Sequence, residues 1–304
     1  MAAVTPAPSQ RPSRWRSVTA IHGWLLVLPA VVLLVAFTHY PAAASFWHSL
    51  FSTPRGDRPA RWVGLVNYRA LVDDPVFWTA LCNNLIYALL TVVPAVALSI
   101  VMALWVNRRI AGRAALRLAY FTPTLLPMIA VANLWLFFYT PGYGLLDQAL
   151  DLFGIPARNW LGSTDTALGA LAVVAVWKEA GFFMLFYLAA LQQITPEFKE
   201  AAMLEGASPW QFFWRVTFPL LMPTTLFVVI NAVINAFRLV DHVVVMTRGG
   251  PDNASMLLLY YIYEVGFKFW DSSYAAALTV VLLTILALIA YLQFNWLERR
   301  THYQ

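Results

Sequence analysis

The sequence predicts an all-α membrane protein with six transmembrane helices. Of its 304 residues, 61% are hydrophobic and 12% are charged, and the mean hydropathy is +0.65. Soluble globular proteins carry about 25% charged residues, so this chain has roughly half the usual share. Mostly apolar runs long enough to cross a bilayer as a helix recur along the chain. They cover residues 22–46, 79–106, 115–139, 167–191, 217–240 and 274–297.

The first run, 22–46, is predicted to be a membrane span. It is too long and too apolar for a simple signal peptide, and no small-residue cleavage pattern follows it. Pro29 and Pro41 are compatible with a membrane helix when neighbouring groups satisfy the freed carbonyls. The preceding residues 1–20 are rich in Pro, Ser, Ala and Arg and lack apolar periodicity, so we expect a disordered cytoplasmic tail.

The basic residues predict the orientation of the spans. They gather in the N-terminal tail, in the segment between the second and third spans, and at the C-terminus: Arg11, Arg14, Arg16, Arg108, Arg109, Arg113, Arg299 and Arg300. The positive-inside rule then places both termini in the cytoplasm, together with the loop between the fourth and fifth spans. This pattern explains the net charge of +5 better than nucleic-acid binding does.

The segment between the first and second spans fits this orientation less well. It carries several arginines and aspartates, and we expect it to fold as extracytoplasmic structure: Arg55, Arg58, Arg61, Arg69, Asp57, Asp73 and Asp74. Residues 21–304 as a whole are predicted to form a single transmembrane domain, with a cytoplasmic loop at about 192–217. Cys82 is the sole cysteine, which excludes an intrachain disulfide, and no His or Cys spacing indicates a metal site.

The cytoplasmic loop is predicted to be a short helix, a sharp turn and a second helix. Thr195 and Pro196 form a helix-start signal, and Gly206 is suited to the left-handed conformation that ends many helices. Ser208 followed by proline restarts a helix, which we expect to enter the bilayer at about Pro219.

Within this loop, Glu200, Ala201 and Ala202 are candidates for contact with another protein. The small alanines allow a partner surface to approach closely, and a rigid helix with a fixed bend can transmit a displacement to the spans beside it. The alternative is a surface helix that only connects two spans, because Glu-Ala-Ala is a common helical tripeptide.

The spacing of the whole loop favours the first interpretation. Glu200-Ala201-Ala202, three residues, Gly206, nine residues, and then Val216, Phe218 and Pro219 resemble the "EAA loop" of ABC-importer permeases. Val216 and Phe218 stand where that pattern most often has Ile and Leu. Further similar stretches are Trp62–Tyr68, Tyr120–Pro123, Val176–Lys178, Leu188–Ile194, Val245–Pro251 and the C-terminal His302–Gln304.

Together these stretches resemble the permeases of carbohydrate-uptake ABC importers, the maltose-permease-like group, and within it the glycerol-3-phosphate permeases. The resemblance implies a bacterial inner-membrane importer with a second homologous permease, an ATPase dimer and an extracytoplasmic binding protein. It assigns Glu200, Ala201, Ala202, Gly206 and Pro219 to ATPase coupling. No phosphate-binding loop of the G-x-x-x-x-G-K-[ST] type occurs here, so ATP would be used by a partner chain, and we expect no cofactor and no catalysis in this one.

Polar residues within the spans are candidates for the substrate pathway. Asn231, Asn235 and Arg238 share one helical face, and Asp241 follows near the outer end of that span. Asparagine amides suit sugar hydroxyls, and arginine suits a carboxylate or phosphate. The alternative is structural: the asparagines hold helices together and Arg238 pairs locally with Asp241.

Lys178 and Glu179 lie near the middle of the fourth span. Adjacent helical residues point about 100° apart, so the two need not pair with each other. Either of them can face the pathway or a partner permease, and we include Lys178 among the candidate residues of the substrate pathway.

Two other function classes remain open at this point. A six-span secondary transporter or channel working as a dimer is the first, although it gives no reason for the Glu-Ala-Ala…Gly loop. A membrane-embedded enzyme is the second, but it requires clustered His, Asp or Cys at bilayer depth. A disaccharide, another oligosaccharide, a polyol and glycerol-3-phosphate all remain possible substrates.

Overall fold

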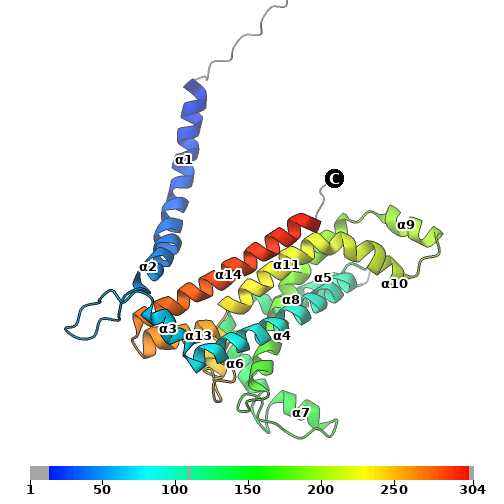
Figure 1. Cartoon of the computed structure of the whole chain (residues 1–304). Helices are drawn as coiled ribbons and strands as arrows, with labels where there is room; N and C mark the ends of the chain where they lie inside the picture. Colours follow the sequence, from blue (N-terminus) through cyan, green and yellow to red (C-terminus); the bar gives the residue numbers. More distant parts are fainter. Residues whose placement is uncertain (1–13, 109–110, 301–304) are drawn as a thin grey trace, which may run out of the picture.

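Residues 14–108 and 111–300 are described by a computed structural model, in which the regular elements are all helices and two isolated β-bridges occur in the loops (Figure 1). The predicted all-α class is therefore confirmed. In chain order the helices are α1 (Arg14–Leu34), α2 (Tyr40–His48), α3 (Val66–Val72), α4 (Pro75–Val106), α5 (Arg113–Leu125), α6 (Met128–Phe138), α7 (Leu145–Asp151), α8 (Ala167–Gln193), α9 (Pro196–Leu204), α10 (Pro209–Phe212), α11 (Phe218–Arg238), α12 (Asp241–Met246), α13 (Leu258–Tyr263) and α14 (Ser272–Arg300). Three π-helical turns are η1 (Val35–His39), η2 (Phe213–Thr217) and η3 (Glu264–Lys268).

Five helical stretches in the described residues are long and apolar enough to cross a membrane. They are His22–His48, Pro75–Val106, Ala167–Gln193, Pro209–Met246 and Ser272–Gln293. The predicted tail 1–20 lies mostly outside the described residues, and α1 covers its part from Arg14 onward.

The predicted continuous span 115–139 is wrong in its shape. It is divided into α5 and α6, which are bent by 102° relative to each other. Leu126 adopts an extended conformation with φ −81° and ψ 139° because it precedes Pro127, and a residue before proline is sterically excluded from the helical region. If the bent pair counts as one span, the described chain has up to six.

Two of the π turns explain how prolines fit into long helices. Tyr40 donates its amide to the carbonyl of Val35, and Phe218 donates to that of Phe213, each five residues back. A proline follows directly in both cases, Pro41 and Pro219. Because proline lacks an N–H and its ring clashes with the carbonyl four residues back, a locally widened turn lets the helix continue.

The buried residues form two clusters stacked along the bundle. One joins the first halves of α4 and α8 to α6, α12, α13 and α14, and the other joins the second halves of α4 and α8 to α11. On α8 the first cluster ends at Ala175 and the second begins at Ala180. On α11 the last buried residue of the second cluster is Ala232, and the first buried residue of the first cluster is Ala236. Val233, between them, packs against both clusters. Residues between these positions form a seam between two apolar cores, which we call the core seam.

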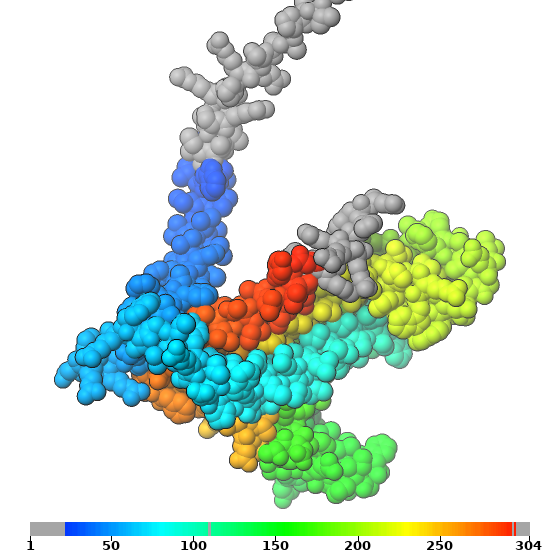
Figure 2. All heavy atoms as spheres, viewed as in Figure 1, coloured from blue at the N-terminus to red at the C-terminus, as the bar shows by residue number. Residues whose placement is uncertain are grey.

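The two ends of the bundle differ in what they carry. Figure 1 places α9, α10 and the end of α14 at one end, and α3, α13 and the segment that joins α2 to α3 at the other. The space-filling view shows α1 extending away from the bundle, and its apolar window is not buried against the rest of the chain (Figure 2). Because the described residues leave this apolar surface exposed, lipid or another subunit must cover it.

Candidate coupling loop and membrane-embedded polar residues

Helix α9 begins as its sequence predicts. Thr195 is the N-cap residue with an extended backbone, and Pro196 is the first helical residue, where its missing N–H has no intrahelical partner to lose. A hydrogen bond from Thr195 lowers the pKa of the Glu197 carboxyl in the first turn. The helix start therefore holds a negative charge where the helix dipole favours it.

Gly206 ends the helix in a Schellman motif. Its φ is +74°, its amide donates to the carbonyl of Met203 at 3.1 Å, and the amide of Ala207 donates to that of Ala202 at 2.9 Å. A side chain at position 206 would meet no atom within 4 Å, so the requirement for glycine comes from the backbone conformation alone. The predicted helix and sharp turn are both present.

The chain then restarts as a helix at Ser208. The Ser208 hydroxyl accepts from the Gln211 amide at 3.3 Å, and the Gln211 side chain accepts from the Ser208 amide at 2.8 Å, which completes a capping box. The helical path runs on through α10, η2 and α11. The second helix thus begins at Pro209 after the Ser208 cap, as the sequence predicts, and Pro219 lies inside it, ten residues further on.

The surface of α9 is exposed and partly apolar. Glu200 and Ala201 are exposed and Ala202 is half-buried. Beside them Leu204 is 91% exposed and Phe198 51%. In both whole-molecule views α9 and α10 project from the end of the bundle (Figures 1 and 2). An isolated chain thus presents apolar side chains on a self-capped helix, which is typical of a surface that another protein covers.

The polar face of α11 is present, and its members differ in their bonding. The Asn231 amide donates to the carbonyl of Phe227 in its own helix at 2.8 Å. The Asn235 amide instead donates to Glu179 of α8 at 3.1 Å. Arg238 is exposed at the end of the helix and has no ion pair within the described residues. The cation of this face is therefore free to meet a group from outside the chain.

Asp241 does not continue this face. The helix stops at Arg238, Leu239 is extended, and Asp241 begins the separate helix α12, which packs against α6. No ion pair joins Arg238 to Asp241 in the described part of the chain, so the predicted local pairing is absent. Spacing along one ideal helix was the wrong basis for grouping the two residues, because the backbone breaks between them.

Lys178 lies in the core seam and contacts α5. Its ammonium donates to the carbonyl of Thr124 at 3.2 Å, and the Thr124 hydroxyl donates to the carbonyl of Lys178 at 2.9 Å. Glu179 points to Asn235 instead, so the adjacent acid and base do not pair with each other, in agreement with the sequence. The seam thus connects α8 to α5 through Lys178 and to α11 through Glu179.

Sequence reasoning missed a second group of buried polar contacts, centred on α4. The Asn84 amide donates to the carbonyl of Ala236 at 3.2 Å, and its side-chain oxygen accepts from the amide of Leu258 at 3.1 Å. Tyr87, one turn further on, lies 2.8 Å from the ring of His242, and both are fully buried. Asn84 and His242 are polar residues within apolar stretches of the sequence, and this pattern could have indicated that both form buried hydrogen bonds.

Comparison with known proteins identifies the family. Residues 75–303 match the family described as "Binding-protein-dependent transport system inner membrane component". A probable ABC transporter permease of Pyrococcus horikoshii is 30% identical over 273 residues, covering 89% of this chain and 93% of the relative. The sn-glycerol-3-phosphate transport system permease of Agrobacterium fabrum is 31% identical and covers 92% and 96%. The sulfoquinovosyl glycerol transport system permease of that organism is 32% identical and covers 86% and 85%.

Solved structures show the same fold. A chain of a bacterial ABC transporter that imports the acidic polysaccharide alginate superimposes with a TM-score of 0.82, at 22% identity, over 95% of this chain and 99% of that one. The alginate transporter in complex with its alginate-bound periplasmic protein gives 0.83, at 21% identity. The present chain belongs to the family of binding-protein-dependent transport system inner membrane components and is a permease subunit of an ABC importer, a transport component that works with a separate ATPase subunit.

Proposed function

We propose that this subunit forms half of a translocation pathway for a sugar or for glycerol-3-phosphate, and that α9 receives the movement of an ATPase partner. The complex would contain a second homologous permease, two ATPase subunits that use ATP, and an extracytoplasmic binding protein. Six spans, with the bent pair α5–α6 as one of them, would put both termini and α9 on the cytoplasmic side of a bacterial inner membrane. Family membership argues against the secondary-carrier alternative.

The exposed apolar surface of α9 carries the coupling part of this proposal. Glu200, Ala201 and Ala202 lie on a helix that is fixed at one end by Thr195 and at the other by Gly206. The next helix runs without a break from Pro209 into the membrane as far as Arg238. A displacement of α9 would therefore reach α11 through a single turn, and α11 carries the polar face.

The polar face of α11 supports the pathway part. Arg238 is exposed and unpaired, Asn235 is held by Glu179, and Asn231 is half-buried. Amides that bind hydroxyls, and a guanidinium that binds an anionic group, match the chemistry of sugars and glycerol-3-phosphate. Two of the relatives are named for the transport of sn-glycerol-3-phosphate and of sulfoquinovosyl glycerol. Each of these compounds joins an anionic group to a polyol or sugar.

Co-purification tests the coupling surface. The tagged chain is co-expressed with the proposed partner subunits, and Leu204→Ser is compared with Leu152→Ser, which changes another leucine, 85% exposed and directly after α7. We expect Leu204→Ser to reduce the amount of ATPase that co-purifies, and Leu152→Ser to leave it unchanged. Equal ATPase recovery from both variants would overturn the assignment of α9.

Uptake into proteoliposomes tests the pathway. With ATP inside and the binding protein outside, radiolabelled glycerol-3-phosphate and a neutral disaccharide are compared for wild type, Asn235→Ala and Arg238→Ala. Arg215→Ala is the matched control, because Arg215 is also exposed on the same helical run but lies before α11. Loss of uptake of the anionic substrate alone in Arg238→Ala selects glycerol-3-phosphate, and wild-type uptake in both pathway variants would refute the pathway.

A further inference from the structure

A pocket lined by arginines lies at the end of the bundle opposite α9. Its volume is about 360 Å³, within the range of about 300–1,000 Å³ typical of small-molecule sites. The lining comes from the segment between α2 and α3 and from Asp271: Ser52, Thr53, Arg55, Arg58, Pro59, Arg61, Val63, Val66, Asn67 and Asp271.

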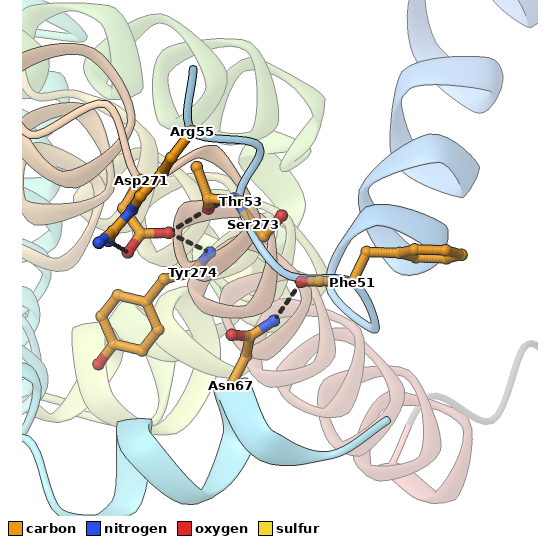
Figure 3. A network of polar contacts seen from close by, with 7 residues as sticks. All are labelled: Phe51, Thr53, Arg55, Asn67, Asp271, Ser273 and Tyr274. Carbon is orange, nitrogen blue, oxygen red and sulfur yellow. Dashed lines mark hydrogen bonds and ion pairs between the residues drawn. The ribbon is translucent and has the colours of Figure 1, made fainter. Parts of the chain in front are cut away.

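The wall of the pocket is a hairpin that the rest of the fold holds in place. Phe51 pairs with Trp62 and Arg55 with Arg58 across the two arms. At the base of the hairpin the Asn67 side chain of α3 donates to the carbonyls of Ser49 and Phe51 at 2.7 and 2.9 Å. Figure 3 shows Thr53 and Arg55 converging on Asp271, just before α14. The pocket is therefore a preformed feature anchored on two helices.

The charges in this pocket do not balance. Asp271 is its one carboxylate, and it already accepts the Thr53 hydroxyl and the Tyr274 amide while lying 3.7 Å from Arg55. Arg58 and Arg61 are exposed and have no ion pair within the described residues. Arg55 and Arg58 also form a cross-strand pair, and like charges in that position destabilise a hairpin. A bound anion would offset this repulsion.

The position of the pocket relative to the membrane indicates which anion it binds. The candidate span His22–His48 ends shortly before the hairpin, and the candidate span that starts at Ser272 begins directly after Asp271. Both flanks are membrane-span ends, so the pocket lies at the membrane–water boundary, where phospholipid phosphates are located. Trp47 and Trp62, 60% and 59% exposed, both contact the ring of Phe51 beside it, in tilted and edge-on geometry respectively. Exposed tryptophans at that depth are typical of the interfacial aromatic belt of membrane proteins.

We propose that this pocket binds the phosphate of an anionic phospholipid headgroup through Arg58 and Arg61, with Arg55 completing the site. Guanidinium groups present paired N–H donors that match phosphate oxygens. The tryptophans would lie at the glycerol and acyl boundary of the same lipid. The bound lipid would tie the hairpin, and with it the starts of α3 and α14, to the membrane surface. This proposal does not depend on which solute the importer carries.

Lipid retention tests it. The full chain with its co-expressed subunits is placed in nanodiscs of phosphatidylcholine with and without phosphatidylglycerol, released into mild detergent, and native mass spectrometry counts the bound phosphatidylglycerol. The double variant R58A/R61A is compared with Arg69→Ala, which removes an exposed arginine of α3 that does not line the pocket. We expect retention to fall about tenfold or more in the double variant, the size expected for loss of hydrogen bonds between charged groups, and to stay at wild-type level in Arg69→Ala.

A further variant and a competing soluble anion distinguish a bound lipid from other sources of negative charge. The variant R58K/R61K keeps the charge and should retain an intermediate amount of lipid, which also guards against misfolding of the alanine variant. Displacement of phosphatidylglycerol by millimolar inorganic phosphate would assign the pocket to a soluble anion and overturn the lipid proposal. Equal retention in R58A/R61A and Arg69→Ala would overturn it as well, and weaker binding of the periplasmic partner with unchanged lipid would instead assign the arginines to protein docking.

Discussion

Gly181 and Gly206 lie in two regions that use glycine for opposite reasons. At Gly181, in the middle of α8, a Cβ atom would lie 1.9 Å from the carbonyl oxygen of Tyr120 in α5, so the missing side chain allows two helices to touch. At Gly206 the surrounding space is open, and only the positive φ requires glycine. The membrane region is specified by packing between distant segments, and the proposed coupling loop, residues 192–217, by rules of local backbone geometry.

This difference predicts different consequences of damage. In the α5–α8 contact any added atom forces two backbones apart, so folding should fail first. In the coupling loop the chain should still fold and insert, and the connection to another subunit should fail first.

The largest effect is expected for Gly181→Val. The side chain would force α5 away from α8 and would also disturb the Lys178–Thr124 hydrogen bonds one turn away. Overpacking of a tight core typically costs about 1–3 kcal/mol and sometimes more, and we expect the upper end because the obstacle is backbone. Thermal unfolding in detergent measures it, with Gly169→Val in the same helix as the control, because a Cβ there meets nothing within 4 Å. Equal stability of the two variants would remove the packing argument.

Gly206→Val should have a smaller effect on folding and a larger one on coupling. A β-branched residue in the left-handed region is strained by about 1–2 kcal/mol, and the loop can relieve that strain by losing its bend. We expect normal insertion, reduced ATPase recovery and reduced ATP-driven uptake. Gly206→Asn is the control, because asparagine tolerates this conformation and should retain most uptake. Wild-type uptake by the valine variant would show that the bend plays no part in coupling.

The same division explains what the sequence could and could not predict. Thr195, Gly206 and Ser208 were identified as helix signals because each acts on neighbours within a few residues. The Asn235–Glu179 and Tyr87–His242 contacts join residues 56 and 155 positions apart, and no pattern along the chain pairs them. Composition and apolar length gave the approximate places of the five long spans, but not the break in the third predicted one.

Where the structure differs from the sequence-based predictions, the cause is a local break in the backbone. Pro127 excludes Leu126 from the helical region and breaks the predicted third span. Arg238 and Asp241 were grouped by helical spacing, although α11 ends between them.

Ser208→Ala sharpens the comparison within the coupling loop. Loss of the capping box leaves the first amides of α10 unsatisfied, which typically costs about 0.5–2 kcal/mol of helix stability. Because α10 is continuous with a span, we expect the loss to appear as local fraying rather than unfolding. Hydrogen exchange at residues 208–212 should increase while exchange within α8 stays unchanged. Faster exchange throughout the bundle would mean that this end is not independent of the packed region.

The smallest effect is expected from Asp74, which caps α4 at the opposite end. Burial acts to raise the pKa of its carboxyl, but hydrogen bonds from the hydroxyls of Tyr261 and Tyr274 and from the amides of Val76 and Phe77 outweigh it and hold the pKa below the usual 3.8. A carboxyl with a lowered folded pKa stabilises the fold above its unfolded value and loses that contribution as pH falls through the folded one.

The stabilisation by Asp74 should therefore be complete at neutral pH and decline only below about pH 4. Asp74→Asn keeps the shape and a good capping residue but cannot titrate. We expect the thermal midpoint of the wild type to fall more steeply than that of Asp74→Asn as the pH is lowered below about 4. Between pH 6 and 8 the carboxyl of Asp74 should make no difference to the pH dependence of either midpoint. Parallel curves would mean that the two tyrosines bind the neutral and the charged carboxyl equally well. Asp74 would then cap α4 through its local geometry and not through its charge, as the uncharged Ser208 caps α10.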